Sequence, residues 1–236
     1  MKITRLKHAF LLTTLITTLY TSAQNTMASH EFVDLGLPSG LLWATCNVGA
    51  NVPPAYGNYY AWGEVNTKND YSSDTYKYCN PTNTWPNEHG AEIPYLTKYC
   101  TNINYGDNDF IDLKTTLETY DDVASIKWGG TWRIPTDEEW TELRENCTWT
   151  WFYDYGDTGV SGYKVIGENG NYIFLPAAGF RDGYELRDAR GYGEYWSSSL
   201  NATRPSHANA VLFSKFGVYH LDANRDSGLP VRPVCK

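Results

Sequence analysis

The sequence predicts an α+β fold, in which two helices accompany several small antiparallel sheets within one domain. Three observations lead to this prediction. Short stretches of apolar and aromatic residues recur between turn-forming residues, helical patterns occur at two places, and neither a repeat nor a linker divides the chain. A length of 236 residues is sufficient for one domain with a sizeable core.

The composition excludes two broad classes of protein. With 9 tryptophans and 19 tyrosines, the aromatic content is 15%, far more than a disordered chain carries. The formal net charge is −8, and no basic stripe is visible. Because phosphate binding needs clustered lysine and arginine side chains, we expect no nucleic-acid partner.

Residues 1–23 have the pattern of a secretory signal peptide. Basic residues precede an apolar run from Ala9 to Tyr20, and small residues follow at Thr21, Ser22 and Ala23. A run of about twelve residues is shorter than the roughly 20 that a membrane span needs. We therefore expect export, with the mature chain in the periplasm, at the cell surface or outside the cell, and without a transmembrane segment. The alternative is an uncleaved anchor or a buried N-terminal helix.

The first half of the mature chain predicts short strands and one long insertion. Val33–Leu37 and Leu41–Thr45 are two strands joined by a tight turn at Pro38, Ser39 and Gly40. Residues 59–65 form an aromatic strand. Residues 66–109 are rich in Asn, Thr, Tyr, Asp and Pro without periodicity, which predicts an irregular insertion packed by its own aromatic residues. An insertion of this length usually has a function or is held covalently.

Two helices follow the insertion. The first spans Asp121–Trp128, with Asp121 or Asp122 as its N-cap and the glycine pair after Trp128 as its end. The second begins at Thr136, which can cap the free N–H groups while Glu139 bonds back to the cap. This capping role accounts for the acidic residues at the helix start, which otherwise resemble catalytic carboxylates. Trp140, Leu143 and Cys147 follow at helical spacing and are expected to face the core.

The last third of the chain predicts strands again. A hairpin is expected where Glu168, Asn169 and Gly170 supply the turn, since Asn-Gly accepts the positive φ angles of a tight hairpin. The expected strands are Gly162–Gly167, Asn171–Leu175, Glu194–Ser198, Asn209–Ser214, Gly217–His220 and Pro230–Val234.

The five cysteines favour a disulfide framework only weakly. They are Cys46, Cys79, Cys100, Cys147 and Cys235. An exported chain meets an oxidising environment, and a Cys79–Cys100 disulfide would close the irregular insertion. Buried free thiols are the alternative. The spacing of cysteines and histidines matches no zinc site, so we expect neither a metal nor a cofactor.

Six stretches resemble a family of exported proteins, the Fibrobacter succinogenes major paralogous domain of Bacteroidota and Fibrobacter. They are VDLGLPSGLLWATCNVGA, YGNYYAWGE, WGGTWRIPTDEEWTEL, IFLPAAGFRDG, YWSSS and GLPVRPV. The resemblance covers nearly all of the mature chain and implies a single domain over residues 24–236. The family is defined by sequence and mostly has no assigned activity.

A more distant resemblance concerns the fold. The stretch RIPTDEEW at 133–140 is similar to the RLPTEAEWE segment of formylglycine-generating enzymes, which have a C-type-lectin-like fold. This likeness implies two helices beside small, twisted antiparallel sheets, neighbouring chain termini and long loops on one side. The reactive cysteine pair of that enzyme family is missing, because Tyr195–Ser199 stands at the corresponding place.

Calcium binding is not expected from the sequence. The EPN, QPD and WND motifs of calcium-dependent lectins do not occur. The nearest oxygen-rich cluster is Asp107, Asn108, Asp109 and Asp112, which lacks the glycine and bidentate glutamate of an EF-hand loop. Solvated turn residues are therefore the favoured interpretation of this cluster.

A candidate binding surface combines aromatic and planar polar residues in expected loops. Flat rings stack on sugars or hold peptide segments, and an Arg with an Asp can fix a ligand's orientation. Core packing is the competing explanation, above all for the tryptophans. The candidate residues are Trp149, Trp151, Tyr153, Tyr155, Arg181, Asp182 and Tyr184.

These observations favour a secreted or surface-exposed recognition domain, without enzymatic activity, that binds a glycan or a surface protein. One alternative is an oxidase or hydrolase acting on cell-wall or polysaccharide material, although no nucleophile, phosphate-loop or metalloprotease motif occurs. A third hypothesis is a structural or adhesive surface component. A shallow aromatic surface would favour binding, and converging titratable groups in a cleft would favour an enzyme.

Overall fold

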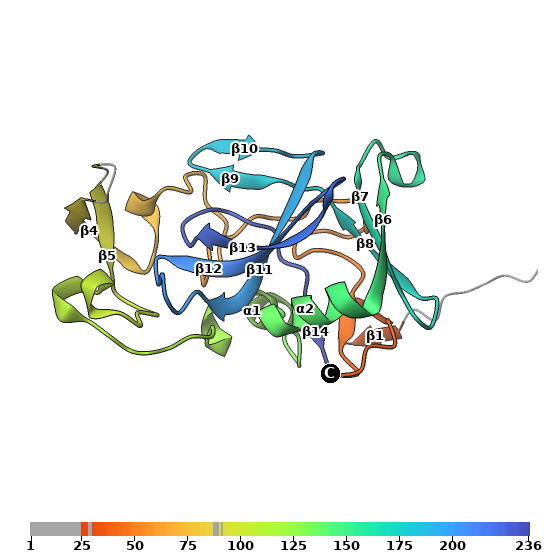
Figure 1. The fold of residues 1–236 in the computed structure, drawn as a ribbon, viewed down its shortest axis with the longest axis horizontal. Coiled ribbons are helices and arrows are strands. Elements are labelled where there is room, and N and C mark those ends of the chain that lie inside the picture. Colours follow the sequence, from red (N-terminus) through yellow and green to blue (C-terminus); the bar gives the residue numbers. More distant parts are fainter. Residues whose placement is uncertain (1–24, 28–29, 87–89, 91) are drawn as a thin grey trace, which may run out of the picture.

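The computed structural model describes residues 25–27, 30–86, 90 and 92–236, so the expected signal peptide at 1–23 lies outside the described residues. The α+β prediction is confirmed. In the part of the chain that the structure describes, two α-helices accompany 14 strands, which form five separate antiparallel sheets (Figure 1).

The elements are short. The two α-helices are α1 (Val123–Trp128) and α2 (Asp137–Asn146). The strands are β1 (Asn25–Met27), β2 (His30–Asp34), β3 (Leu42–Ala44), β4 (Cys79–Pro86), β5 (Glu92–Leu96), β6 (Cys147–Phe152), β7 (Gly162–Gly167), β8 (Tyr172–Pro176), β9 (Phe180–Asp182), β10 (Glu185–Arg187), β11 (Tyr192–Leu200), β12 (His207–Ser214), β13 (Gly217–Asn224) and β14 (Val234–Cys235). Single 3-10 turns are η1 (Ser73–Thr75), η2 (Ile103–Tyr105), η3 (Asp107–Asp109), η4 (Thr119–Asp121) and η5 (Tyr155–Asp157).

The first and last strands of the domain share one sheet. Its order is β1-β2-β3-β14, and Trp43 of β3 pairs with Val33 on one side and with Val234 on the other. The indole of Trp43 is fully buried and lies 4.7 Å from the ring of Trp140 in α2. Burial of such a side chain contributes roughly 2–3 kcal/mol. The sheet is therefore tied to α2 through its central strand.

Two three-stranded sheets form the other side of the core. They have the orders β6-β7-β8 and β11-β12-β13, and α2 packs beside β6, β11 and β12. Tyr195 of β11 and Phe213 of β12 are fully buried and stack at 5.7 Å, and Trp140 lies 5.9 Å from Tyr195. These rings join the helix to the β11-β12-β13 sheet.

Both helix starts are confirmed as predicted. The Asp122 carboxylate accepts hydrogen bonds from the N–H groups of Ala124 and Ser125, and α1 ends before Gly129 at φ 69°. In α2, Thr136 Oγ1 accepts from Glu139 N–H while the Glu139 carboxylate accepts from Thr136 N–H. This reciprocal pair is a capping box, which satisfies two otherwise free backbone donors.

Two strand predictions are wrong. Residues 59–65 form no strand; Tyr60 exchanges hydrogen bonds with Leu229, and Trp62 N–H donates to the Arg225 carbonyl, while the aromatic side chains fill the core. At the C-terminus, the strand is limited to β14 instead of Pro230–Val234. Pro230 and Pro233 carry no N–H and so cannot continue a ladder.

The insertion is more regular than predicted. Residues 66–109 contain the antiparallel hairpin β4-β5 and three 3-10 turns. The hairpin was not recognised because β4 reads CNPTNTWP, with two prolines and no alternation of apolar residues. Figure 1 shows β4 and β5 at one end of the long axis, with β6, β7 and β8 at the other end.

No helix among the described residues is long and apolar enough to cross a membrane.

Candidate functional site

The two predicted tryptophans lie in a strand, where a loop was predicted. Trp149 and Trp151 belong to β6, pair with Val165 and Tyr163 of β7, and are half-buried against the core. Their rings meet the ring of Tyr163 edge-on at 5.4 and 5.2 Å. The Trp151 indole N–H is buried and has no hydrogen-bond partner among the described residues. Core packing therefore accounts for most of the surface of both rings.

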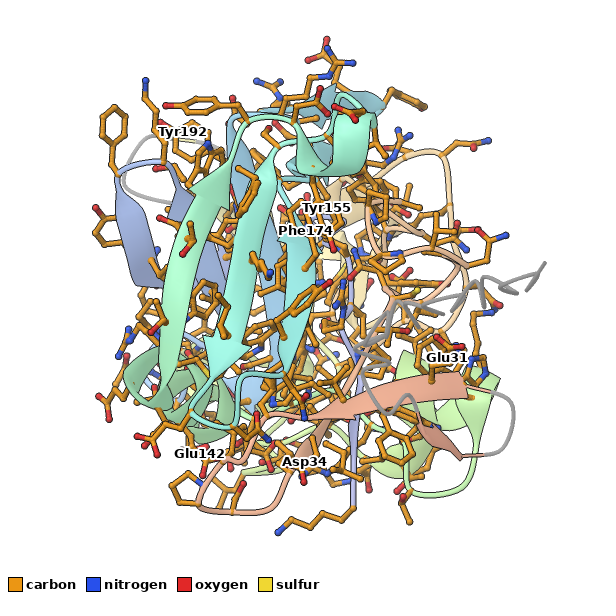
Figure 2. The ribbon with its side chains drawn as sticks, turned by 90° about the vertical axis from the view of Figure 1, so that its right-hand side faces the viewer. Glu31, Asp34, Glu142, Tyr155, Phe174 and Tyr192 are labelled. Carbon is orange, nitrogen blue, oxygen red and sulfur yellow. The ribbon has the colours of Figure 1, made fainter. Side chains whose placement is uncertain are left out.

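The two predicted tyrosines differ from each other. Tyr153 is 73% exposed and meets the Trp151 ring edge-on at 6.3 Å. Tyr155 instead stacks on Phe174 of β8, with ring centroids 3.9 Å apart (Figure 2). Burial raises the pKa of the Tyr155 hydroxyl to about 12. Of these two rings, Tyr153 has the more accessible faces.

Arg181, Asp182 and Tyr184 belong to the β9-β10 hairpin. The Arg181 guanidinium lies 5.3 Å from the centre of the Tyr59 ring, and the Asp182 carboxylate forms an ion pair with Arg187 at 3.1 Å. Tyr184 at the turn is 74% exposed. Within the described residues, no hydrogen bond, ion pair or ring contact joins these three residues to the four predicted aromatic residues, Trp149, Trp151, Tyr153 and Tyr155. The structure does not bring the predicted surface together through direct contacts.

The predicted disulfide between Cys79 and Cys100 does not form in the structure. The Cys79 thiol donates to the carbonyls of Ser73 and Tyr76 at 2.9 and 3.1 Å, and the Cys100 thiol donates to the Asn102 carbonyl at 3.1 Å. Burial raises the pKa of both thiols, to about 11 at Cys79. All five cysteines are free, as in the alternative interpretation.

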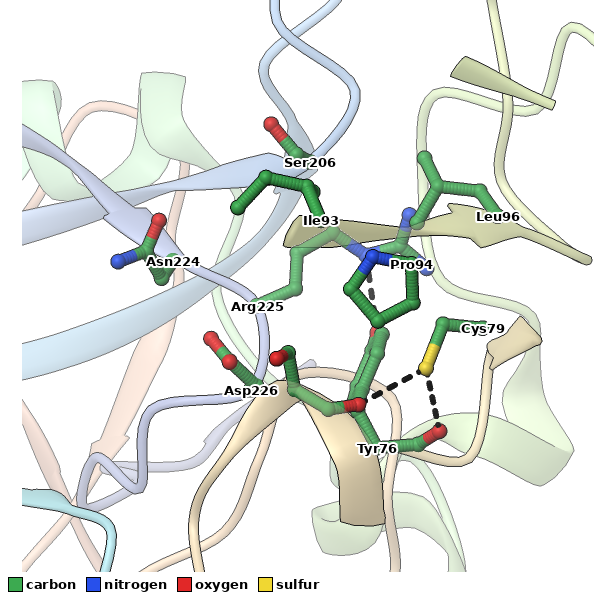
Figure 3. A pocket seen from close by; sticks show the side chains of 10 residues that line it. Tyr76, Cys79, Ile93, Pro94, Leu96, Ser206, Asn224, Arg225 and Asp226 are labelled. Atoms are coloured by element: carbon green, nitrogen blue, oxygen red, sulfur yellow. Dashed lines mark hydrogen bonds between the residues drawn. The ribbon is translucent and has the colours of Figure 1, made fainter. Parts of the chain in front are cut away.

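A small pocket lies between the β4-β5 hairpin and the end of β13. Pro94 and Leu96 of β5 and Cys79 line it, together with Arg225 and Asp226 (Figure 3). Burial raises the pKa of Asp226 to about 6. The pocket volume of about 120 Å³ is well below the 300–1,000 Å³ that is usual for ligand sites. The pocket is therefore too small for a sugar ring together with the sugars linked to it.

A wider depression lies on the other side of the same hairpin. Tyr95, which stands between Pro94 and Leu96 in β5, contributes to it, together with Trp85 of β4 and residues of the loop around η2 and η3. Its volume is about 600 Å³, within the usual range for ligand sites. We call it the Trp85 depression, and its lining residues are Asn83, Trp85, Tyr95, Ile103, Asn104, Gly106, Asn108 and Asp109.

The aromatic and amide groups of the Trp85 depression are held by neighbouring side chains. Trp85 meets Tyr105 edge-on at 5.5 Å. The Asp107 carboxylate accepts from the side-chain amides of Asn83 and Asn80 at 2.6 and 3.0 Å, and these bonds lower the pKa of Asp107. Because Asn83 uses its NH₂ group in this way, its side-chain carbonyl is left to accept hydrogen bonds from a ligand.

The loop that closes the depression has an unusual backbone. Four of the seven non-glycine residues with positive φ among the described residues fall within 99–113, and two of them, Asn108 at 50° and Asp109 at 64°, line the depression. Gly106 permits the tight return of the loop, since a Cβ there would lie 1.8 Å from the Phe110 carbonyl oxygen. Asn and Asp adopt positive φ more readily than other non-glycine residues, so these two positions hold the shape of the loop at low cost.

Two of the three carboxylates of the predicted oxygen-rich cluster, those of Asp107 and Asp112, are engaged by protein donors. Asp112 accepts from the backbone N–H groups of Tyr99, Cys100 and Lys114, and Asp107 accepts from two asparagines. Within the described residues, no group of three or more His, Cys, Asp or Glu side chains is arranged to hold a metal ion.

Comparison with known proteins returned no significant match to a family model, to a curated protein or to a solved structure. The candidate site therefore rests on the geometry of this chain. Sequence reasoning missed Asn83, Trp85, Tyr95 and Asn104, although the length and the Asn- and Tyr-rich composition of residues 66–109 had indicated a functional segment.

Proposed function

We propose that the protein is an exported recognition domain, without enzymatic activity, that binds a glycan at the Trp85 depression. The observation that carries this proposal is the combination of two half-buried aromatic rings with asparagine side chains around one hollow of about 600 Å³. Aromatic faces pack against the C–H groups of a sugar ring, and planar amides hydrogen-bond its hydroxyls.

The lining also favours binding over hydrolysis. Glycoside hydrolysis by the usual mechanism needs two carboxyl groups that flank the scissile bond. Among the eight lining residues, Asp109 is the one that has a carboxyl group. The neighbouring Asp107 carboxylate already accepts hydrogen bonds from two asparagine side chains. This arrangement suits recognition of an intact ligand.

We extend the proposal to fold and family. The mixed fold with small antiparallel sheets, and the union of β3 and β14 in one sheet, are compatible with a C-type-lectin-like domain in which the termini are neighbours. The six motifs described above support membership of the Fibrobacter succinogenes major paralogous domain family. Export is supported by the signal-peptide pattern of residues 1–23.

Substitution of one aromatic residue tests the location of the site. The purified protein is applied to an array of polysaccharides, and affinity for the bound glycans is measured by calorimetry. Trp85→Ala should lower the affinity by about five- to thirtyfold, because loss of aromatic stacking on one ring costs roughly 1–2 kcal/mol. Tyr153→Ala and Tyr184→Ala remove exposed rings from the surface first predicted and should leave the affinity unchanged.

Two outcomes would contradict the proposal. Loss of binding in Tyr153→Ala or Tyr184→Ala, with Trp85→Ala unaffected, would move the site to the surface predicted from sequence. Recovery of cleaved or oxidised glycan after incubation would show an enzyme.

A further inference from the structure

The lining of the Trp85 depression carries negative charge, and the bearing of this charge on the choice of glycan rests on the proposed function. Of the eight lining residues, Asp109 is the charged one, and none is a Lys, Arg or His. Asp109 is exposed at the surface of the loop. The Asp107 carboxylate is also close, because it accepts a hydrogen bond from the Asn83 side chain that lines the depression. A ligand at this place therefore meets negative charge.

The cations of the surrounding segment are engaged elsewhere. Residues 66–120 contain four lysines and no arginine. Lys68 pairs with Glu64, Lys77 with Asp121, and Lys114 with Glu118, while Lys98 pairs with both Glu118 and Asp121. A carboxylate, sulfate or phosphate on a bound sugar would find no free lysine of this segment to neutralise it.

The hydrogen-bonding groups of the depression also favour an uncharged ligand that is rich in hydroxyl groups. The free side-chain carbonyl of Asn83 and the Asp109 carboxylate are acceptors, which sugar hydroxyls satisfy as donors. The Trp85 indole N–H is buried, so it is not offered to a ligand, and acceptors predominate at the wall of the depression. A uronate or sulfate group replaces a hydroxyl donor by an acceptor and adds a charge.

We propose that the Trp85 depression binds neutral, hydroxyl-rich glycans and discriminates against acidic ones, with Asp109 as the residue that determines this specificity. Two like charges about 4 Å apart in water repel by about 1 kcal/mol, which corresponds to an affinity difference of about fivefold. The difference shrinks with added salt, because Asp109 is exposed.

A matched pair of ligands tests the proposal. The neutral polysaccharide that binds best on the array is oxidised at its primary hydroxyls to uronates, so that the backbone and linkages stay the same. At low ionic strength, the oxidised form should bind about fivefold or more weakly than its parent. Asp109→Asn should reduce this difference. Asn is well tolerated at the left-handed φ of 64°, so the variant keeps the loop conformation.

The control variant is Glu185→Gln, which removes one exposed negative charge from β10 and should leave the discrimination unchanged. Equal binding of the oxidised and neutral forms, or tighter binding of the oxidised form, would overturn the inference and leave glycan recognition standing. Undiminished discrimination in Asp109→Asn would overturn the role of Asp109. Absence of binding to every neutral and acidic glycan would overturn the proposed function as well.

Discussion

Arg225 is a fully buried cation for which the structure supplies hydrogen-bond acceptors in place of a carboxylate. Its guanidinium donates to the Tyr76 hydroxyl and to the carbonyls of Lys98, Tyr99 and Pro205. The rings of Trp62, Tyr76 and Tyr99 lie 5.0 to 5.8 Å from it. Burial of a charge is costly unless such partners compensate it. Arg225 thereby fastens the insertion that carries the Trp85 depression to the end of β13.

Arg225→Met should therefore destabilise the protein strongly. The substitution keeps an apolar stem but leaves buried carbonyls and the Tyr76 hydroxyl without their donor, and each unsatisfied group costs about 1–3 kcal/mol. We expect a loss of at least about 3 kcal/mol in the free energy of unfolding, measured by urea denaturation. Arg187→Met is the control, because Arg187 is half-exposed and its ion pairs contribute little. Equal, small losses in both variants would refute this account of Arg225.

At the scale of elements, the start of α2 is stabilised by more than its capping box. The Glu139 carboxylate that accepts from Thr136 N–H also pairs with Arg133 at 2.5 Å, and Arg133 N–H donates to the carbonyl of Val234 in β14. The helix start and the last strand are therefore held by the same short segment.

Thr136→Ala should cost about 1 kcal/mol in unfolding free energy, the usual loss when a capping oxygen is removed. Thr141→Ala is a matched control inside α2, where alanine has the higher helix propensity and no loss is expected. Thermal and urea unfolding of both variants check the prediction. A larger loss in Thr141→Ala than in Thr136→Ala would contradict it.

Elements with strong local signals were predictable from the sequence. The two helices and the β7-β8 hairpin follow from Asp122, Thr136 and the Asn169-Gly170 turn, whose preferences act within a few residues. The failures have a different origin. The sequence of residues 59–65 is typical of a strand, but these residues form an isolated bridge with Leu229 and one hydrogen bond to Arg225 instead of a ladder. The sequence of β4 is typical of an irregular segment, but β4 pairs with β5. Pairing depends on distant partners, which a single sequence does not display.

The candidate site was predictable only in kind. Aromatic and planar polar residues were expected to form it, but Trp149 and Trp151 alternate along β6 and bury one face against Tyr163. The Trp85 depression needs Asn83, Trp85 and Tyr95 to approach residues 103–109, and the hydrogen bonds of Asp107 hold this approach. Nothing in the local sequence indicates that approach.

At the scale of the whole molecule, the carboxyl groups fall into two sets with opposite pH dependence. Burial, with a contribution from Asp188, raises the pKa of Glu194 to about 7. Burial alone would also raise the pKa of Asp121, but hydrogen bonds from Lys98, Tyr78 and Tyr99 outweigh it and hold the pKa below its usual value. Hydrogen bonds from Lys114 and Lys98 lower the pKa of Glu118 to about 2.

We expect the carboxyl groups to give a stability maximum at about pH 4–5. Between about pH 7 and 4 the folded state holds protons on Glu194 and Asp226 that the unfolded chain releases, so these two groups stabilise the fold as the pH falls. Burial lowers the pKa of His30 and His207, and these two groups act in the opposite direction below about pH 6.5. Below about pH 4, Asp121 and Glu118 become protonated in the unfolded chain but stay ionised in the folded state, because their pKa values there are lowered. Stability is therefore lost as the pH falls further. Urea denaturation at pH 3, 4.5 and 8 measures both limbs.

Glu194→Gln should remove most of the loss of stability that the wild-type protein shows between about pH 4.5 and pH 8. The buried charge of Glu194 costs on the order of 3 kcal/mol at pH 8, so the variant should gain stability there and little at pH 4.5. Glu185→Gln, at an exposed position, should follow the wild-type profile. A wild-type stability that increases steadily up to pH 8 would contradict this assignment.

The pairing of β3 with β14 has a consequence for biosynthesis. Leu42 and Trp43 find their partners in Cys235 and Val234, almost at the far end of the chain. A ribosome delivers residues in order, and contacts between distant residues are slow to form because a long loop must close first. The N-terminal sheet therefore stays incomplete until Val234 and Cys235 have been synthesised, and the nascent chain spends that time with the edge of β3 open.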